Sequence, residues 1–561
     1  MSINEHDDEK GKDEPLIKDD GAPDDSPSKA KIFLLYGATV GGMLLVVIIV
    51  FIIALAVGGS SGDKFGSIVA KYRNYEDNAI EIEIISSKYK EYISSIKVDE
   101  GEKQEYKEKY SLSSGVHTIE IFFNSQLEKI DELFKGCLNL EEVNLDSFPN
   151  KDITDMSGMF YSCINLKVVD FGKDTTSKVT NMTNLFYNCP NLNQTEIKNL
   201  DTSNVVDMKN MFKKCSSLST FDFTKINTEK VKNMKGFFSR SGLKKIEFPE
   251  EFAPELTDIR GMFKHCTALK DLDLNNLDLS KITSVSKLFY DCINLKSIDL
   301  DKFNTKNVKD MSYLFYGCSG LKEIDLNNLE TSKVENMEGM FGGCSALNSL
   351  DLKKMNTKNV KNMKNMFYGL NKIKSLDLSK FETSQVTTME GMFDNCISLT
   401  SLDLSKFSGD NLNDMSYMFA GSTKLKSIKF GDNFNTNKVI TMYNMFYGCI
   451  SLTDFDLSSF DTTYVINMSG MFYKCQSITS LDLSNFNTNK VQKMEQMFCY
   501  CSSLEYLDIS DFDTSSLVDK DSYLFLGLNE TGKVVYNPDK FDENLFDLSN
   551  LDWEKEKYPS N

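Results

Sequence analysis

Apolar and polar positions follow one repeating order along most of this chain. Each copy contains a segment such as Leu399, Leu402 and Leu404, in which apolar and polar residues alternate. Such alternation predicts a strand with one buried face. After a turn that contains Thr, each copy continues as Val-x-x-Met-x-x-Met-Phe-x-x-Cys, and apolar spacings of three and four favour a short helical or 3-10 segment. One copy therefore predicts a strand, a turn and a short helix.

The Phe near the end of this pattern marks the period of the repeat. Its sixteen positions are Phe134, Phe160, Phe186, Phe212, Phe238, Phe263, Phe289, Phe315, Phe341, Phe367, Phe393, Phe419, Phe446, Phe472, Phe498 and Phe525. Successive spacings are 26 residues, apart from one of 25 and two of 27. A unit of this length buries its apolar face only by stacking on its neighbours. The pattern predicts an α/β solenoid of sixteen repeats over residues 126–528, with a parallel sheet on one face and the short helical segments opposite.

The complete pattern, Leu-x-x-Leu-x-Leu-x-x-Phe followed by Val-x-x-Met-x-x-Met-Phe-x-x-Cys, resembles the BspA-type leucine-rich repeats. The 26-residue repeat of bacterial and protist surface proteins is the more similar branch. This resemblance implies a leucine-rich-repeat fold with a right-handed coil, surface attachment or adhesion, and no catalytic residues. Common leucine-rich repeats have Asn where this chain has Phe303, Phe381, Phe407, Phe460 and Phe486. A stack of Phe rings is therefore expected in place of an Asn ladder.

The segments outside the repeats differ in composition. Residues 1–31 contain ten acidic residues and five Lys, and we expect them to be disordered. Residues 32–57 carry no charge over 26 positions, which is enough to cross a hydrocarbon layer of roughly 30 Å, so we expect a transmembrane helix that acts as a retained signal anchor. Residues 58–76 are expected to form a linker, residues 77–125 a β-rich N-terminal cap, and residues 529–561 a C-terminal cap.

The orientation in the membrane is less strongly determined by the sequence. Lysines flank both ends of the apolar segment, so the positive-inside rule only slightly favours a cytosolic N-terminus. Gly37 and Gly41 are four residues apart, a spacing that lets two transmembrane helices approach closely. A homodimer formed through these two glycines is therefore an open alternative. Glycosylation sequons are compatible with an external solenoid, and they lie at Asn181, Asn193, Asn467 and Asn529. We expect a single-pass cell-surface protein with its C-terminal solenoid outside.

Composition argues against several classes of function. The net charge of -19 would repel nucleic acid. The three histidines, His6, His117 and His265, are far apart in the sequence and form no metal-binding motif. The sequence contains no His-Glu-x-x-His, Gly-x-Ser-x-Gly or phosphate-binding loop, and carboxylates repeated on most coils do not mark one catalytic pair. We therefore expect no cofactor, no metal site and no enzymatic activity.

Twelve of the 13 cysteines occupy one position of the repeat, where Ser241, Leu370 and Ser422 stand in other coils. Coils about 4.8 Å apart would hold Cβ atoms beyond the usual disulfide limit of about 4.5 Å. Leucine also cannot bind a metal. We expect buried free thiols, with Cys499, which is out of register, as the candidate for an accessible thiol. The repeated Met and Phe positions are expected to pack in the core.

The outward strand position is mostly Asp. The candidate ligand-binding stripe consists of Asp273, Asp299, Asp325, Asp351, Asp377, Asp403, Asp456 and Asp482. Two interpretations are open. One is a solvated face that resists aggregation and tolerates repulsion of roughly 1 kcal/mol between neighbouring carboxylates. The other is a repetitive surface for a cationic or hydroxyl-rich ligand, with any Ca²⁺ bound opportunistically because Asp-x-Asp-x-Asp-Gly loops are missing from the sequence.

A second stripe comprises the tyrosines that follow the repeated Phe: Tyr161, Tyr187, Tyr290, Tyr316, Tyr368, Tyr447 and Tyr473. These side chains either cover the edge opposite the strands or contact a partner.

Three functions are consistent with these features. The leading hypothesis is a membrane-anchored surface protein whose solenoid binds a protein or glycan of other cells or matrix without catalysis. A self-associating surface coat is the second. The third is a membrane-tethered intracellular scaffold, which free thiols favour because reducing compartments keep thiols reduced.

Overall fold

The computed structural model describes residues 65–148, 151–518, 523–546 and 553–557. The expected tail at 1–31 and the expected membrane span at 32–57, with Gly37 and Gly41, lie outside these ranges. Within the described ranges, none of the helices could span a lipid bilayer. These helices are short 3-10 segments: η2 (Ser87–Tyr92), η3 (Gln194–Glu196), η4 (Phe223–Lys225) and η5 (Glu543–Leu545).

A β-rich cap precedes the first coil. Its strands are β1 (Ser67–Asn74), β2 (Ile80–Ile82), β3 (Ile93–Val98), β4 (Lys103–Gln104), β5 (Tyr110–Leu112) and β6 (Gly115–Phe123). Strand β1 lies antiparallel between β6 and the first solenoid strand, β7 (Leu140–Asn144), and so joins the cap to the repeats. Strand β1 thus lies within residues 58–76, where the sequence predicts a linker. Alternating Ile68, Ala70 and Tyr72, all fully buried, explain this strand.

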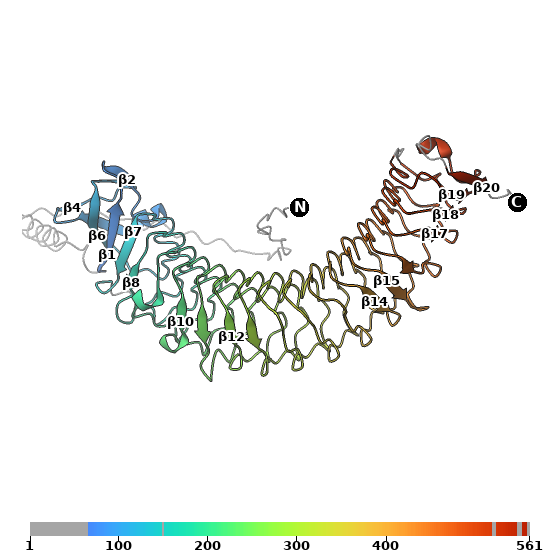
Figure 1. Cartoon of the computed structure of the whole chain (residues 1–561). Helices are drawn as coiled ribbons and strands as arrows, with labels where there is room; N and C mark the ends of the chain where they lie inside the picture. Colours follow the sequence, from blue (N-terminus) through green and yellow to red (C-terminus); the bar gives the residue numbers. More distant parts are fainter. Residues whose placement is uncertain (1–64, 149–150, 519–522, 547–552, 558–561) are drawn as a thin grey trace, which may run out of the picture. The chain divides into compact units, whose positions relative to one another are not determined.

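Successive coils place their strands side by side in parallel, as Figure 1 shows. The strands are β8 (Val168–Asp170), β9 (Ile197–Lys198), β10 (Thr220–Asp222), β11 (Lys245–Glu247), β12 (Asp271–Asp273), β13 (Ser297–Asp299), β14 (Ser401–Leu404), β15 (Ser427–Phe430), β16 (Asp454–Phe455), β17 (Ser480–Asp482), β18 (Tyr506–Ile509), β19 (Lys533–Tyr536) and β20 (Glu554–Lys557). They form several short parallel sheets along one face of the stack. The predicted solenoid with a parallel strand face is confirmed.

The predicted helical segments on the opposite face are wrong, because this face consists of consecutive β-turns. The Met159 N–H donates to the Met156 carbonyl at 3.2 Å and the Cys163 N–H to the Phe160 carbonyl at 3.1 Å, which closes two turns. Between them, the Phe160 N–H leaves its own coil and donates to the Leu185 carbonyl of the next coil at 3.0 Å. A helix would direct every N–H along its own axis, whereas these turns direct alternate groups to the neighbouring coil.

Residues with positive φ values allow these consecutive turns to form. Gly158 has a φ of 60° and Ser162 a φ of 59°, and the pair of positive φ values recurs four residues apart in the following coils. Asn184 and Asn210 occupy the position of Gly158 in the next two coils. Gly and Asn tolerate positive φ better than other residues, and each such residue interrupts a right-handed helix. Apolar spacings of three and four therefore arise here without a helix.

Like side chains stack in columns through the core. The ring centroids of Phe134 and Phe160 lie 5.7 Å apart, and the last pair of the column, Phe498 and Phe525, lies 6.0 Å apart. The Met residues of the repeat are buried in the same way. The second expected stack is also present, since Phe381 and Phe407 have parallel rings 6.3 Å apart. The prediction that these columns are core packing is confirmed.

The cysteine column is buried and all 13 cysteines are free thiols, as expected. Eleven of these thiols donate to the carbonyl of a Phe in the preceding coil; for example, Cys163 donates to the Phe134 carbonyl at 3.0 Å. Ser422 occupies the same position in its coil and makes the equivalent bond, donating to the Phe393 carbonyl at 2.8 Å. Cys499 is only 1% exposed, so the prediction of an accessible thiol is wrong. It fills the position of the Tyr stripe, where its smaller side chain is covered.

A column of buried threonines holds the turns after the strands together. The Thr331 hydroxyl donates to the Asn356 carbonyl at 2.9 Å and accepts the Asn356 N–H at 2.7 Å. Thr357 forms the same pair of bonds with Glu382 in the next coil. Each buried hydroxyl therefore links two successive coils through both backbone groups of one residue.

We expect Thr331→Val to lower the free energy of unfolding by about 2 kcal/mol, since it removes both hydrogen bonds between the buried Thr331 hydroxyl and the backbone of Asn356. Hydrogen exchange of the Asn356 amide should accelerate, and denaturant titration should report the loss of stability. Thr479→Val is the matched control, because Thr479 is exposed. Equal effects of the two substitutions would contradict a bridging role for the buried hydroxyl.

Candidate functional site

The structure brings the eight aspartates of the expected stripe to the exposed strand face, one per coil. Strand pairing aligns Asp273 directly with Asp299. Asp403 lies opposite Lys429, so a lysine interrupts the row of aspartates in that coil. Nearer the N-terminus, Lys198 of β9 pairs with Asp170 of β8. The alignment of outward side chains is therefore regular except around β9.

Each of these aspartates also has a structural role that the sequence did not reveal. One carboxylate oxygen accepts the backbone N–H two residues further on, and the distance is 2.8 Å for Asp273, 2.9 Å for Asp403 and 3.0 Å for Asp482. The other donors are Asp301, Asn327, Lys353, Ser379 and Ser458. These Asx-turns end the strand and start the turn. The bond uses one oxygen of each carboxylate and fixes its orientation.

Hydrogen bonding also keeps several of these carboxylates charged. The Ser379 hydroxyl and N–H, together with Lys353 and Lys380, hold the pKa of Asp377 below its usual value. Ser405 lowers the pKa of Asp403 in the same way. The strand face is therefore acidic near neutral pH, and its charges have fixed positions.

A second Asx ladder lies on the turn face and was missed in the sequence. The residue before the first Met of Met-x-x-Met-Phe accepts the N–H two residues on, as in Asn181 at 3.0 Å and Asn467 at 2.9 Å. Both are partly buried. Recurrence of Asn, Asp, Ser or Thr at this position was the available signal. Two of the four sequons therefore lie within the stacked turns.

The Tyr stripe is partly packed and partly exposed. The rings of Tyr161 and Tyr187 stack at 4.4 Å, and those of Tyr447 and Tyr473 at 4.8 Å. Tyr447 is nevertheless 38% exposed. Lys264 lies 4.8 Å from the centroid of Tyr290, so ammonium groups cover part of the stripe. Packing within the stripe accounts for its regular spacing.

The N-terminal cap holds a Ser-His-Asp cluster. His117 Nδ1 lies 2.8 Å from Asp99 Oδ2, and His117 Nε2 lies 3.2 Å from Ser113 Oγ. This order resembles a nucleophilic triad. However, Nε2 lies closer, at 3.0 Å, to the Ser113 carbonyl oxygen. The Ser113 carbonyl thus competes with the Ser113 hydroxyl for Nε2, and the cluster links the β3–β4 turn to the β5–β6 hairpin.

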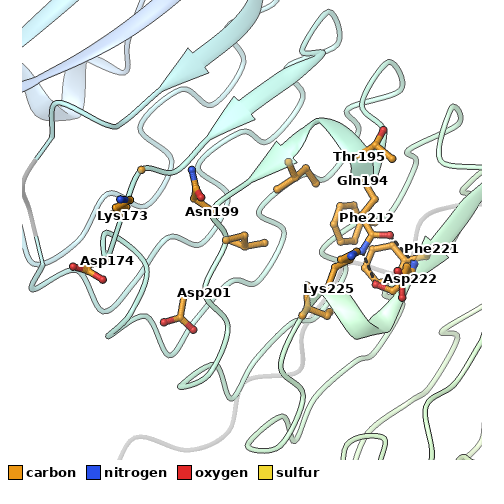
Figure 2. Close-up of a pocket in the computed structure, with 14 residues that line it drawn as sticks. Lys173, Asp174, Gln194, Thr195, Asn199, Asp201, Phe212, Phe221, Asp222 and Lys225 are labelled. Atoms are coloured by element: carbon orange, nitrogen blue, oxygen red, sulfur yellow. Dashed lines mark hydrogen bonds between the residues drawn. The ribbon is translucent and has the colours of Figure 1, made fainter.

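A cleft of roughly 710 Å³ opens beside the strand ends of three consecutive coils, as Figure 2 shows. Its floor is apolar and consists of Ile197, Leu200, Phe212, Phe221 and Ile226. Its polar lining includes Lys173, Asp174, Gln194, Thr195, Asn199, Asp201, Asp222 and Lys225. Three carboxylates and two ammonium groups thus line the cleft around an apolar base. The size and composition are typical of a binding site.

The cleft has two causes in the sequence. The first cause lies in the second Phe column, which includes Phe148, Phe252 and Phe303. Three consecutive coils lie between Phe148 and Phe252, and at this position they carry Asp174, Leu200 and Ile226 in place of Phe. Column members elsewhere are nearly fully buried, whereas Leu200 and Ile226 are only partly buried and Asp174 is exposed. Because these three coils lack the Phe ring, the turn after the strand is not completely filled, and a gap remains there.

The second cause is a register shift. Val169 of β8 pairs with Ile197 of β9, which lies 28 positions further on, whereas Leu272 pairs with Ile298, 26 positions further on. The extra residues form η3, and β9 and β10 belong to different sheets. Across this break, Gln194 Nε2 donates to the Asp222 carbonyl at 2.8 Å and Gln194 Oε1 accepts the Asp222 N–H at 2.6 Å. A side-chain amide therefore replaces a strand neighbour.

Among the described residues, no group of three or more His, Cys, Asp or Glu side chains has the arrangement of a metal site. The stripe carboxylates are spread along the stack, one per coil, and do not converge.

Comparisons with known proteins place the repeats in a family. A model of the family described as "Mycoplasma protein of unknown function, DUF285" matches residues 116–169, 154–246, 257–376, 344–430 and 426–533. No curated protein matches the chain significantly.

Solved structures show similarity over most of the chain. A leucine-rich repeat protein from Bacteroides ovatus is 16% identical, with 83% of this chain and 99% of that chain covered and a TM-score of 0.37. A leucine-rich cell surface protein from Faecalibacterium prausnitzii is 15% identical, with 78% and 90% covered and a TM-score of 0.26.

The His117 cluster predicts a defined pH dependence. Burial alone would lower the pKa of His117, but its bonds with Asp99 and with the Ser113 carbonyl outweigh burial and raise the pKa above 6.5. Asp99 has a lowered pKa because the His117 and Thr118 donors outweigh burial. The His117 contribution to stability is complete below the unfolded pKa and is lost as pH rises through the folded pKa. The Asp99 contribution is present above its unfolded pKa and is lost as pH falls through its folded pKa.

We therefore expect NMR titration of histidine-selective ¹³C labels to give His117 a pKa above 6.5. Asp99→Asn should lower this pKa and should remove the stability gained between the two folded-state pKa values. His265→Gln provides the control for assignment, since it should leave the His117 titration unchanged. An unshifted His117 pKa in Asp99→Asn would show that the imidazole does not depend on this carboxylate.

Proposed function

Because the chain belongs to the family described as "Mycoplasma protein of unknown function, DUF285", which has no stated activity, we propose a function from its own surfaces. We propose that it is a membrane-anchored surface protein whose solenoid binds a protein or glycan without catalysis. The acidic stripe from Asp273 to Asp482 is the proposed contact surface. The uncharged residues 32–57 are the proposed anchor, with the solenoid outside the cell.

The fixed carboxylates of the stripe are the observation that carries this proposal. Each Asx-turn bond holds one carboxylate of Asp273, Asp403 or Asp482 in a defined orientation on an exposed strand. Repetition in eight of the nine coils from Asp273 to Asp482 then gives a long surface with closely spaced negative charge, which Lys429 interrupts once. Such a surface complements cationic or hydroxyl-rich ligands and loses little entropy when it binds.

The cysteine column does not favour the alternative of an intracellular scaffold. Burial raises the pKa of Cys215, Cys266, Cys344, Cys396 and Cys501 to about 12. A buried, neutral thiol reacts slowly in any compartment. Free thiols are therefore compatible with an external solenoid.

We expect replacement of Asp351, Asp377, Asp403 and Asp456 by Asn to weaken saturable binding to cells or matrix roughly tenfold, because exposed ion pairs contribute about 0.2–1 kcal/mol each. Asn retains an oxygen that accepts the Asx-turn N–H, so the fold should persist. Added salt should weaken wild-type binding and narrow the difference.

The matched control removes the same number of charges elsewhere, by Asn substitution of the exposed turn residues Asp278, Asp410, Asp432 and Asp539. If this variant loses as much binding as the stripe variant, net charge explains the result and the stripe is not the contact surface.

The proposed orientation of the chain in the membrane can be tested separately. We expect an epitope tag after Asn561 to be accessible to antibody on intact cells, and a tag before Met1 to be accessible only after permeabilisation, because the proposed anchor leaves the solenoid outside. The opposite accessibility would reverse the proposed topology.

A further inference from the structure

The cleft between the coils of β8, β9 and β10 differs from the stripe because it occurs where the repeat is irregular. We propose that it binds a short extended segment of a partner polypeptide, which pairs with β10 and places one apolar side chain on the cleft floor beside a basic residue. This inference deepens the proposed function and rests on it, since it names the kind of partner that the solenoid binds.

The backbone of β10 supplies the first argument. Its neighbour β11 pairs with one edge, and on the other edge the sheet ends before β9. The Asp222 N–H and carbonyl on this edge are both bonded by the amide of Gln194. These are the two bonds that one residue of an antiparallel neighbouring strand would form with Asp222. The Gln194 side chain therefore occupies the position that an extended segment would take. Such a segment would displace only this side chain and would leave the pairing of β10 with β11 intact.

The floor supplies the second argument. Leu200 and Ile226 stand where other coils carry a buried Phe or another buried apolar residue, and both are only partly buried. An apolar side chain from a segment paired with β10 would restore the missing volume of the column. Extended peptides that join a sheet edge obtain affinity from main-chain bonds and specificity from pockets for alternate side chains.

The charges supply the third argument. Asp174, Asp201 and Asp222 line the cleft together with Lys173 and Lys225, so the lining is acidic by one charge. Figure 2 shows Asp174 and Asp201 on one side and Asp222 on the other. The whole chain carries a charge of -19. A Lys or Arg next to the apolar residue is thus the complementary sequence.

The test uses the full-length protein and a positional-scanning library of blocked, fluorescein-labelled hexapeptides, with binding followed by fluorescence anisotropy. We expect selection of Leu, Ile or Phe at one position and of Lys or Arg beside it. The best peptide should lose at least about tenfold in affinity when the amide that pairs with Asp222 is N-methylated. This comparison uses wild-type protein, so a folding defect cannot produce it.

Two substitutions have opposite expected effects. Leu200→Arg should weaken peptide binding by at least about tenfold, because it places a charge on the apolar floor. Gln194→Ala should strengthen binding severalfold, because it removes the side chain that occupies the peptide position. Gln492→Ala, at an exposed position on another coil, is the matched control and should have no effect.

Several results would overturn the inference. The first is that no library peptide binds with a Kd below roughly 1 mM. The second is that the N-methylated peptide binds with the same affinity as the unmodified peptide. The third is that neither Leu200→Arg nor Gln194→Ala changes the affinity for the peptide. The Asn variant of the stripe separates this inference from the proposed function. Loss of macromolecular binding in that variant without peptide binding to the cleft would remove only the cleft proposal. Peptide binding together with an unaffected stripe variant would remove only the stripe.

Discussion

Backbone hydrogen bonds between successive coils impose the constraint on which the other features depend. On the turn face, the N–H of one coil donates to a carbonyl of the next, as Phe160 does to Leu185. This geometry needs left-handed residues such as Gly158 and Ser162, which direct alternate N–H groups along the stack. Buried backbone groups tolerate few missing partners, so every coil must follow the same path. Identical paths then place equivalent side chains above one another, and the columns of Phe, Met, Cys and Thr follow.

This constraint also explains why polar residues recur inside an apolar stack. Cys163 and Ser422 differ in chemistry but share a short donor that reaches a Phe carbonyl of the preceding coil. Thr331 both donates to and accepts from one residue of the next coil, so a single hydroxyl satisfies two backbone groups. At the surface, each strand aspartate accepts one backbone N–H of its own coil. Side chains that look like candidate ligands in the sequence are therefore partners of the backbone first, and the charge of the exposed carboxylates is available in addition to that role.

The sequence predicted the stack, the columns and the parallel strand face, because a constant period is a direct consequence of identical coils. It failed on the opposite face, where a spacing of three and four is common to helices and to consecutive β-turns. Gly158, Asn184 and Asn210 at equivalent positions were the signal that distinguishes them. The eight stripe aspartates lie on the exposed strand face, but their Asx-turns were not evident from the sequence. Asp174 in a Phe column was visible in the sequence, but the shift of β9 against β8, and hence the cleft, depends on how η3 absorbs two residues.

Regularity and irregularity have different consequences for recognition. A stripe that repeats in most coils offers a ligand many similar registers, each displaced by about 4.8 Å, so it favours binding without fixing a position. A cleft that depends on Asp174, Leu200 and Ile226 fixes one position along the stack. Electrostatic complementarity mainly accelerates association, whereas a filled apolar pocket mainly slows dissociation. On the two proposals made above, the stripe would gather a partner along the solenoid, and the cleft would determine which segment of that partner is held and in which register.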